Sequence, residues 1–419
     1  MAPPKRPVTI SFDGEEILAE AGETVAHALV GNGYTALARS PKFHRRRGPA
    51  CMRGACDGCL VRIDGSPNAM ACMTTVHPGM RIESQNTMGT RDVDLLRVTD
   101  WLFPHGLNHH ELFAGIPGLQ DVMQTFARRV AGLGVMPTAV EPARPSVRRA
   151  VDVVVIGGGP AGILVATRLA GAGRTVELIE DGPVLGGGLR ALPAAARAAF
   201  GAQLGPGLDA LVASNVRVRT RTTAGAFFGE DLLVAGPEGA ELLVPTITVL
   251  ATGAHDTLPP FEGNDLPGVM SARAGGMLLS RGVRPGLTTL IVVEPGAPGD
   301  GGLGDHLAKE MGLRVVRGNV EAAKGSGAVS EVRVLIDGQS TPFEADALLV
   351  DGPRAPAYEL ASQRGAKLAH EPNGYRVTVD ENACIMHGVY AVGEAIGTPF
   401  DARALDADAA RVTAHVLAR

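Results

Sequence analysis

Four cysteines stand close together near the start of the chain. Cys51, Cys56 and Cys59 follow the spacing C-x4-C-x2-C, and Cys72 comes after twelve intervening residues. A loop that supplies three thiolates, with a fourth from a later segment, has the ligand spacing of a plant-type [2Fe-2S] cluster. The spacing therefore predicts a one-electron redox centre held by these four cysteines.

The residues between the cysteines suit such a cluster. Gly54, Ala55 and Gly58 let the backbone approach the inorganic sulfides, and their N–H groups can donate to sulfur and raise the reduction potential. Arg53 adds a positive charge nearby. Four thiolates also suit tetrahedral zinc, but zinc ribbons pair two C-x2-C knuckles and this segment has one. We therefore favour iron–sulfur over zinc.

A glycine-rich turn follows an apolar, β-branched run at residues 151–156. Gly157, Gly159 and Gly162 form G-x-G-x-x-G at the start of an expected helix, and Glu180 ends the next expected strand. In this context the glycines permit a tight turn, backbone approach to a pyrophosphate and close packing of helix on strand, while the acid binds ribose hydroxyls. The segment predicts a dinucleotide-binding βαβ unit.

Two later segments favour FAD as the dinucleotide, although NAD uses the same fingerprint. Residues 246–253 are an apolar strand ending in Ala-Thr-Gly, and residues 388–397 contain Gly393 and Glu394. Both resemble segments of glutathione-reductase-like flavoproteins, which usually have Asp where this chain has Glu394. The predicted cofactor contacts are Gly157, Gly159, Pro160, Ala161, Gly162, Glu180, Thr252, Gly253, Gly393 and Glu394.

A second dinucleotide-binding domain is expected between these segments, and its fingerprint is degraded. Glu294 and Pro295 follow its apolar strand, and the glycines after them lack the triad spacing. Without the glycines the backbone cannot approach a pyrophosphate closely. We therefore expect a structural role for this domain and disfavour an ordinary NAD(P)H-binding reductase.

With 419 residues the chain is too long for one hydrophobic core. We expect a mixed fold, α+β and α/β: a β-grasp [2Fe-2S] ferredoxin-like domain, and then a flavoprotein fold with two dinucleotide-binding domains, like glutathione reductase. Two strands around Asp13-Gly14 and a short helix after them support the first domain. The predicted boundaries are 1–95 for the β-grasp domain, 96–150 for a connector, 151–258 with 345–419 for the FAD domain, and 259–344 for the inserted domain.

Composition excludes several classes of protein. The net charge of -5 is spread without long runs, so neither a nucleic-acid groove nor an anionic membrane surface is indicated. No apolar run reaches the ~18 residues of a membrane span, and the N-terminus lacks the apolar core of a signal peptide. We expect a cytoplasmic protein without a membrane span.

Some other residues have ordinary interpretations. His105, His109 and His110 lack a carboxylate or cysteine at ligand spacing, and we expect packing or surface roles for them. Cys384 has no C-x2-C partner and reads as a small hydrophobe, which argues against a disulfide reductase. The basic run at residues 45–47 reads as a solvated face that can also dock an acidic partner.

The order of these parts resembles the α (A) subunits of heterotetrameric sarcosine oxidase, opine oxidase, D-hydroxyproline dehydrogenase and hydrogen cyanide synthase. The resemblance covers essentially the whole chain. It is carried by the four cysteines, the glycine fingerprint and the segments DWLFPHGLNHHELF, LATGAHDTLPPFEGNDLPGVMSA and DALLVDGPRAPAYELASQRGA.

The resemblance implies a hetero-oligomer. A separate flavin subunit of the D-amino-acid-oxidase type oxidises the C–N bond, with FMN expected at the interface, and electrons leave through this chain to a downstream acceptor. The folate-binding part of sarcosine oxidase α is not expected here, which favours a dehydrogenase. Two alternatives stay open: a self-contained NAD(P)H-linked flavin and iron–sulfur reductase, and a non-catalytic nucleotide-binding scaffold. No residue presents itself as a base for substrate, so no catalytic residue is assigned.

Overall fold

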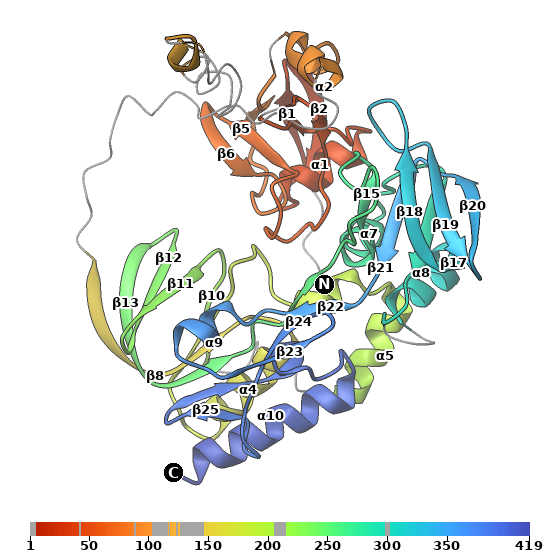
Figure 1. Ribbon diagram of the computed structural model, residues 1–419. Helices are drawn as coiled ribbons and strands as arrows, with labels where there is room; N and C mark the ends of the chain where they lie inside the picture. The colour runs from red at the N-terminus through yellow and green to blue at the C-terminus, as the bar shows by residue number, and fades with distance from the viewer. Residues whose placement is uncertain are drawn as a thin grey trace.

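The computed structural model describes residues 6–41, 43–87, 89–102, 116, 118–122, 125, 146–204, 215–297 and 302–419. Three units pack together (Figure 1): an N-terminal sheet with one helix, a large sheet built from two separate stretches of chain, and a smaller parallel sheet inserted between those stretches. Most of the predicted connector, including its three histidines, lies outside the described residues.

The N-terminal unit is the predicted β-grasp fold. Its first hairpin turns at Asp13 and Gly14, which both have positive φ, as a two-residue hairpin turn requires. The sheet order is β2-β1-β7-β5-β6, with β1 and β7 parallel, and α1 buries nearly all of its residues against the core. The elements are β1 (Pro7–Phe12), β2 (Glu15–Glu20), α1 (Val25–Gly31), β5 (Leu60–Ile63), β6 (Ser66–Met70) and β7 (Arg81–Ser84).

The large sheet is centred on the apolar strand β8. Its neighbours β9 and β13 are both parallel to it, and its alternate residues face opposite layers. Val153 and Val155 pack beneath α4 and α10, whereas Val154 and Ile156 pack on the other face. The elements are β8 (Val147–Ile156), α4 (Pro160–Gly171), β9 (Val176–Ile179), α5 (Ala194–Leu204), β10 (Arg217–Arg219), β11 (Thr223–Phe228), β12 (Asp231–Gly236), β13 (Gly239–Leu250), β25 (Cys384–Met386), β26 (Val389–Ala391) and α10 (Ala402–Leu417).

The inserted unit has a parallel sheet of order β15-β21-β16-β17 and an antiparallel three-stranded sheet. β21 lies beyond the boundary predicted at residue 344, yet it pairs with β15 and β16, so this unit extends to Asp351. The sequence of β21 is a short apolar run, which suits a strand buried on both faces in either parallel sheet. The boundary predicted from the sequence was therefore misplaced. The elements are β15 (Val269–Ser271), α7 (Ala272–Leu279), β16 (Thr289–Val293), α8 (Leu303–Met311), β17 (Arg314–Arg317), β18 (Asn319–Lys324), β19 (Glu331–Ile336), β20 (Gln339–Glu344) and β21 (Ala347–Asp351).

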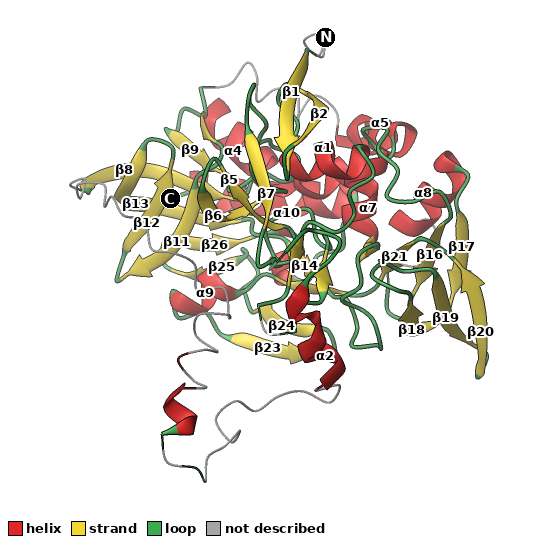
Figure 2. Ribbon diagram, turned by 90° about the horizontal axis from the view of Figure 1, so that it is seen from above, coloured by secondary structure: helices red, strands yellow, loops and turns green. Residues whose placement is uncertain are grey.

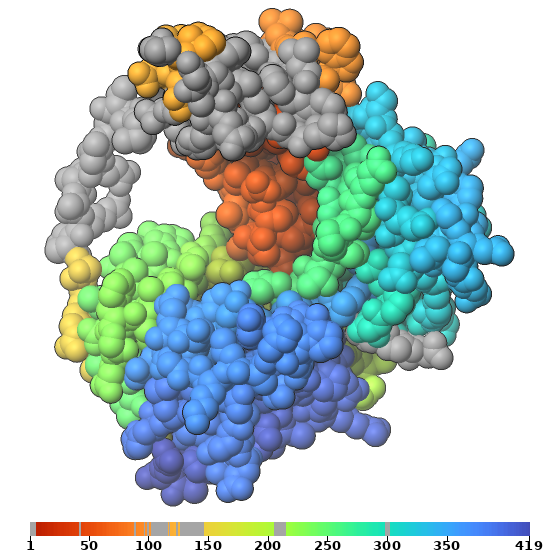
Figure 3. Space-filling model, in the orientation of Figure 1, coloured from red at the N-terminus to blue at the C-terminus, as the bar shows by residue number. Residues whose placement is uncertain are grey.

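The N-terminal unit is seated against both other units (Figures 2 and 3). Residues of α1 and α7 belong to one hydrophobic core. Ala50 O accepts from Ser271 N at 3.0 Å, and Arg47 pairs with Asp265 at 2.5 Å. The cysteine loop is therefore held in a fixed position over the flavoprotein-like part.

Short elements complete the described structure. They are β3 (Ala38–Arg39), β4 (Arg46–Arg47), η1 (Leu95–Arg97), α2 (Val98–Leu102), η2 (Gly187–Ala191), β14 (Ala254–Asp256), β22 (Arg354–Pro356), α9 (Glu359–Gln363), β23 (Leu368–Glu371), β24 (Gly374–Val377) and η4 (Gly393–Ile396). Of the helices in the described ranges, none has both the length and the apolar character needed to cross a bilayer.

Candidate cofactor sites

The four predicted cluster ligands meet at one end of the β-grasp sheet. Cys51, Cys59 and Cys72 are buried, and Cys56 is half-buried. The loop directs main-chain donors at the sulfurs: Ala55 N lies 3.3 Å from Cys51 Sγ, and Gly54 N lies 3.3 Å from Cys72 Sγ. Donors of this kind stabilise thiolates and raise the reduction potential of a bound cluster.

The sulfurs are close enough to share protons. Contact with the Cys56 thiol, followed by Cys72, lowers the pKa of Cys51 to about 2, while contact with Cys51 raises the pKa of both partners. Three buried cysteines and one half-buried cysteine, with main-chain N–H groups directed at their sulfurs, are a donor set that a two-iron cluster can use. The residues present therefore fit the predicted cluster, and the choice of iron–sulfur over zinc still rests on the cysteine spacing.

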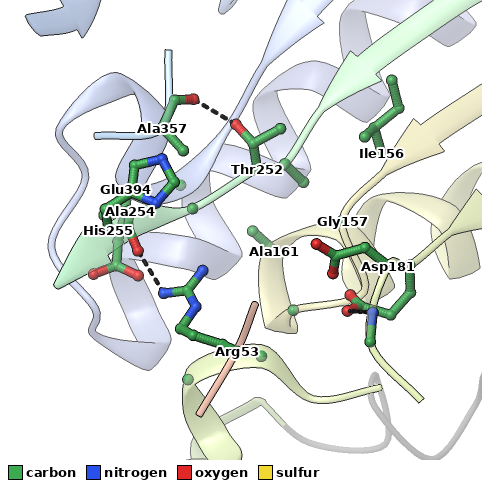
Figure 4. A pocket seen from close by; sticks show the side chains of 18 of the residues that line it. Arg53, Ile156, Gly157, Ala161, Asp181, Thr252, Ala254, His255, Ala357 and Glu394 are labelled. Carbon is green, nitrogen blue, oxygen red and sulfur yellow. Dashed lines mark hydrogen bonds between the residues drawn. The ribbon is translucent and has the colours of Figure 1, made fainter. Parts of the chain in front are cut away.

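A cavity of about 380 Å³ opens at the carboxyl ends of β8 and β13, beside the glycine fingerprint (Figure 4). Gly159 lines it, and a Cβ built there meets nothing nearer than Gly187 Cα at 4.0 Å, so the backbone faces open space. Gly162 packs inward, where a Cβ would lie 2.0 Å from Gly157 O. These two positions have the geometry of a pyrophosphate cradle at a helix N-terminus.

Glu180 follows the last residue of β9 and contacts the glycine turn between β8 and α4. Its carboxylate accepts from Gly158 N at 2.7 Å and from Gly182 N at 2.8 Å. Burial, with a smaller contribution from neighbouring Asp181, raises the pKa of Glu180 to about 7. Glu180 lines the cavity, and its role in binding ribose hydroxyls stays a prediction.

The two late segments reach the same cavity. Thr252 Oγ1 donates to Ala357 O at 2.7 Å, which fixes the end of β13 (Figure 4). Glu394 accepts from Arg354 at 3.0 Å and lies 3.6 Å from Arg273. The predicted residues that line the cavity are Gly157, Gly159, Pro160, Ala161, Glu180, Thr252, Gly253, Gly393 and Glu394.

Sequence reasoning missed several lining residues, notably Arg190, Arg273, His255 and Met277. Arg190 closes a glycine run, LGGGLR, whose abundance of glycine was the available signal. His255 lies in the segment LATGAHDTLPPFEGNDLPGVMSA, which carries the family resemblance but gave no specific role to this residue. Arg273 and Met277 lie on α7, where no motif marks them. They belong to the cavity because the inserted unit folds back against the large sheet.

The cysteine loop forms part of the cavity wall. Arg53, Gly54 and Ala55, which lie between Cys51 and Cys56, line the cavity, as does Met73, which follows Cys72. The two predicted cofactor sites are therefore adjacent, with only loop residues between them.

Known proteins combine these same two parts. A model described as a 2Fe-2S iron-sulfur cluster binding domain matches residues 5–87, and one described as pyridine nucleotide-disulphide oxidoreductase matches residues 151–279. Hydrogen cyanide synthase subunit HcnA of Pseudomonas aeruginosa is 43% identical over 79 residues, covering 19% of this chain and 75% of that protein. Sarcosine oxidase subunit alpha of Rhizobium meliloti is 29% identical over 413 residues, covering 86% of this chain and 41% of that protein.

The chain belongs to the family of sarcosine oxidase α subunits and hydrogen cyanide synthase A subunits. It spans about two fifths of the length of the sarcosine oxidase subunits it matches. L-proline dehydrogenase from P. horikoshii has the same fold, with a TM-score of 0.71 and 25% identity over 100% of this chain and 74% of that one. The predicted order, a [2Fe-2S] ferredoxin-like domain before an oxidoreductase fold, is confirmed.

In the inserted unit, two carboxylates of the chain accept main-chain hydrogen bonds near the segment where the second nucleotide fingerprint was expected. Gly304 N, in the first turn of α8, donates to Asp351 Oδ2 at 2.7 Å, and Glu294 Oε1 accepts from Val320 N at 3.1 Å. Both acids are buried, which raises the pKa of each. A carboxylate therefore already uses a first-turn N–H at the position where a pyrophosphate binds in this fold. The geometry supports the structural role predicted for the inserted unit.

The basic run does not form a free solvated face. Arg45 pairs with Asp100 at 2.7 Å, Arg46 with Asp92 at 3.6 Å and Arg47 with Asp265. These acids lie far along the chain, so their proximity could not be read from local sequence.

Cys384 is remote from the cluster. It is half-buried on β25, and its thiol donates to Met386 O at 2.9 Å. This supports its interpretation as a packing residue.

Proposed function

We propose that this chain is the electron-transfer subunit of a multi-subunit, flavin-dependent dehydrogenase of amines or imino acids. One observation carries the proposal: Arg53, Gly54 and Ala55 of the cysteine loop line the same cavity as the dinucleotide fingerprint. A two-electron flavin beside a one-electron cluster lets a reducing pair leave as single electrons. The chain's role is to hold the two cofactors side by side.

The substrate class follows from the relatives. Their names specify sarcosine oxidase, opine oxidase and L-proline dehydrogenase, whose named substrates carry a C–N bond next to a carboxylate. We place sarcosine, hydroxyproline, opines and glycine in the class to be tested. The relatives named as subunits support a hetero-oligomer, and we assign substrate oxidation to a flavin partner of the D-amino-acid-oxidase type.

The cavity itself offers little for substrate chemistry. Among the carboxylates that line it, Glu180 is held by main-chain N–H groups and by contact with Asp181, and Glu394 is held by arginines. His255 pairs with Glu359 at 3.0 Å, but both side chains are about half exposed, at the rim. A general base works best where it is positioned against a bound substrate and shielded from water. We therefore place the base on the partner.

For the dinucleotide we propose FAD, with NAD as the alternative. The fingerprint, Glu180, and the meeting of Thr252 and Gly393 at one cavity support a dinucleotide held along its length. FMN belongs to the interface with the flavin partner in this proposal, and a downstream acceptor takes the electrons from the cluster. Chromatography of cofactors released by acid distinguishes FAD, NAD and FMN directly.

The test compares the chain alone with the complex that it forms when co-expressed with a flavin subunit of the D-amino-acid-oxidase type. Steady-state turnover is measured with sarcosine, proline, hydroxyproline, glycine and opines, using an artificial acceptor. We expect turnover by the complex and none by the chain alone, which should also oxidise little NAD(P)H. Rapid turnover by the chain alone, abolished by His255→Gln, would overturn the assignment to the partner.

A further inference from the structure

Arg53 connects the cysteine loop to the dinucleotide cavity. Its main-chain N–H points at Cys51 Sγ, 3.5 Å away, and its Nη1 donates to Ala254 O at 2.6 Å (Figure 4). Ala254 is the first residue of β14, and it lines the cavity together with Thr252 and Gly253. One residue thus contacts both predicted cofactor sites.

The positive charge of Arg53 is less neutralised than that of the neighbouring arginine. Arg273 also donates to Ala254 O, at 3.2 Å, but it pairs with Asp256 at 2.5 Å and lies 3.6 Å from Glu394. In the described part of the chain, no carboxylate lies within ion-pair distance of Arg53, and its side chain donates to the carbonyl of Ala254. Asp256, Glu394 and Asp181 attract Arg53 only over longer distances. Its charge is therefore not taken up by an ion pair and can act on both cofactors.

Both cofactors gain from this charge. A [2Fe-2S] cluster becomes more negative when it takes up an electron, and a dinucleotide carries a negatively charged diphosphate. Inside a protein, screening by water is weaker than in bulk solution, so a nearby cation stabilises each of these forms.

We propose that Arg53 raises the reduction potential of the cluster and also strengthens dinucleotide binding, and that the redox state of one site is coupled to the occupancy of the other through the repulsion between their negative charges. This inference rests on the two cofactors of the proposed function, but not on the partner or the substrate. Because the two sites are adjacent, a reduced cluster should repel the diphosphate. By reciprocity the bound dinucleotide lowers the potential of the cluster.

The first experiment separates charge from hydrogen bonding. Arg53→Gln keeps an N–H donor for Ala254 O and loses the charge, whereas Arg53→Lys keeps the charge. Arg81→Gln removes one charge from an exposed position on β7 of the same unit and serves as the matched control. The cluster midpoint potential of each full-length variant is measured by redox titration with electron paramagnetic resonance, after iron and sulfide content are checked.

We expect a lower midpoint potential for Arg53→Gln, and potentials close to the parent protein for Arg53→Lys and Arg81→Gln. A parent-like potential in Arg53→Gln would overturn the proposal, because the hydrogen bond alone would then account for Arg53. An equal drop in Arg81→Gln would also overturn it, since net charge would explain the effect.

The second experiment uses the parent protein, so its result does not depend on whether a variant retains the cluster. The dinucleotide is first removed from the parent protein by dialysis, and ADP, the part shared by FAD and NAD, is then titrated into it with the cluster oxidised and again with the cluster reduced. We expect at least about fivefold weaker binding in the reduced state. Equal affinities would contradict the coupling. Neither experiment uses amine turnover, so failure here leaves the relay proposal standing, and failure of the relay leaves the coupling testable.

Discussion

His27 Nε2 lies 3.0 Å from Met277 O, and so joins α1 of the ferredoxin-like unit to α7 of the inserted unit. A carbonyl can only accept, so Nε2 carries the proton and donates, while Nδ1 accepts from the Thr24 hydroxyl at 2.7 Å. Burial lowers the pKa of His27 to about 4. The contact between the units therefore depends on a neutral imidazole.

Acidification should weaken this contact. The folded state holds His27 neutral down to a pKa of about 4, while the unfolded chain takes up the proton near the ordinary value of 6.5, so stability is complete above pH 6.5 and falls as the pH drops toward 4. The loss in free energy of unfolding is about 2 kcal/mol near pH 5 and about 3 kcal/mol at full protonation. Urea denaturation near pH 7.5 and near pH 5 measures it. His27→Gln should show a smaller drop than the parent, and identical drops would count against this role.

Removal of one cluster ligand should abolish the cluster. Cys56→Ser is expected to lose iron, labile sulfide and the visible absorption, because a [2Fe-2S] cluster needs four thiolates. Cys384→Ser, which lies remote from the loop on β25, is the control and should keep them. Anaerobically purified parent protein should hold iron and sulfide in equal amounts. Zinc without sulfide would refute the cluster.

A side chain at the pyrophosphate cradle should empty the dinucleotide site. Gly159→Leu is expected to remove the bound dinucleotide because its side chain would fill the open space beside the backbone. Gly171→Leu, at the other end of α4, is the matched control, since a Cβ there meets nothing within 4 Å. The amount of cofactor released by denaturation reports the result, and a full complement in Gly159→Leu would exclude this cradle.

The affinity for the dinucleotide should depend on pH through Glu180. The ionised carboxylate accepts ribose hydroxyls better than the neutral acid does, and burial places its pKa at about 7. Dinucleotide binding should therefore weaken below pH 7, approaching tenfold per pH unit. Equilibrium dialysis between about pH 6 and pH 8 measures this, and Glu180→Gln should bind weakly with little pH dependence. A strong pH dependence that persists in Glu180→Gln would assign it to another group.

The parts of the structure that local sequence determines were predictable. The Asp13-Gly14 hairpin, the βαβ unit from β8 to β9 and the cysteine loop each depend on residues close in sequence, with spacings fixed by strand, helix or cluster geometry. Nine of the residues predicted to contact the dinucleotide line one cavity. This follows from the parallel sheet, because the carboxyl ends of its strands lie at the same edge.

Contacts between the units were not predictable. Arg273 reaches the cavity because α7 follows β15 of the inserted unit, and Arg47 finds Asp265 more than two hundred residues away. Neither the position of Arg273 at the cavity nor the contact between Arg47 and Asp265 follows from a spacing in the sequence. The boundary predicted at residue 344 was misplaced for a related reason. The strand after it, β21, is apolar on both faces, and such a strand suits either of the two parallel sheets.

In the function that we propose, electrons from substrate reach the cluster of this chain only through a partner subunit. The most direct measurement adds sarcosine, proline, hydroxyproline, glycine or an opine anaerobically to the co-expressed complex and to the chain alone, and follows the electron paramagnetic resonance signal of the reduced cluster. The account predicts a signal in the complex with its substrate and none in the chain alone. Reduction of the cluster by substrate in the chain alone, or undiminished turnover of a Cys72→Ser complex with its physiological acceptor, would contradict it.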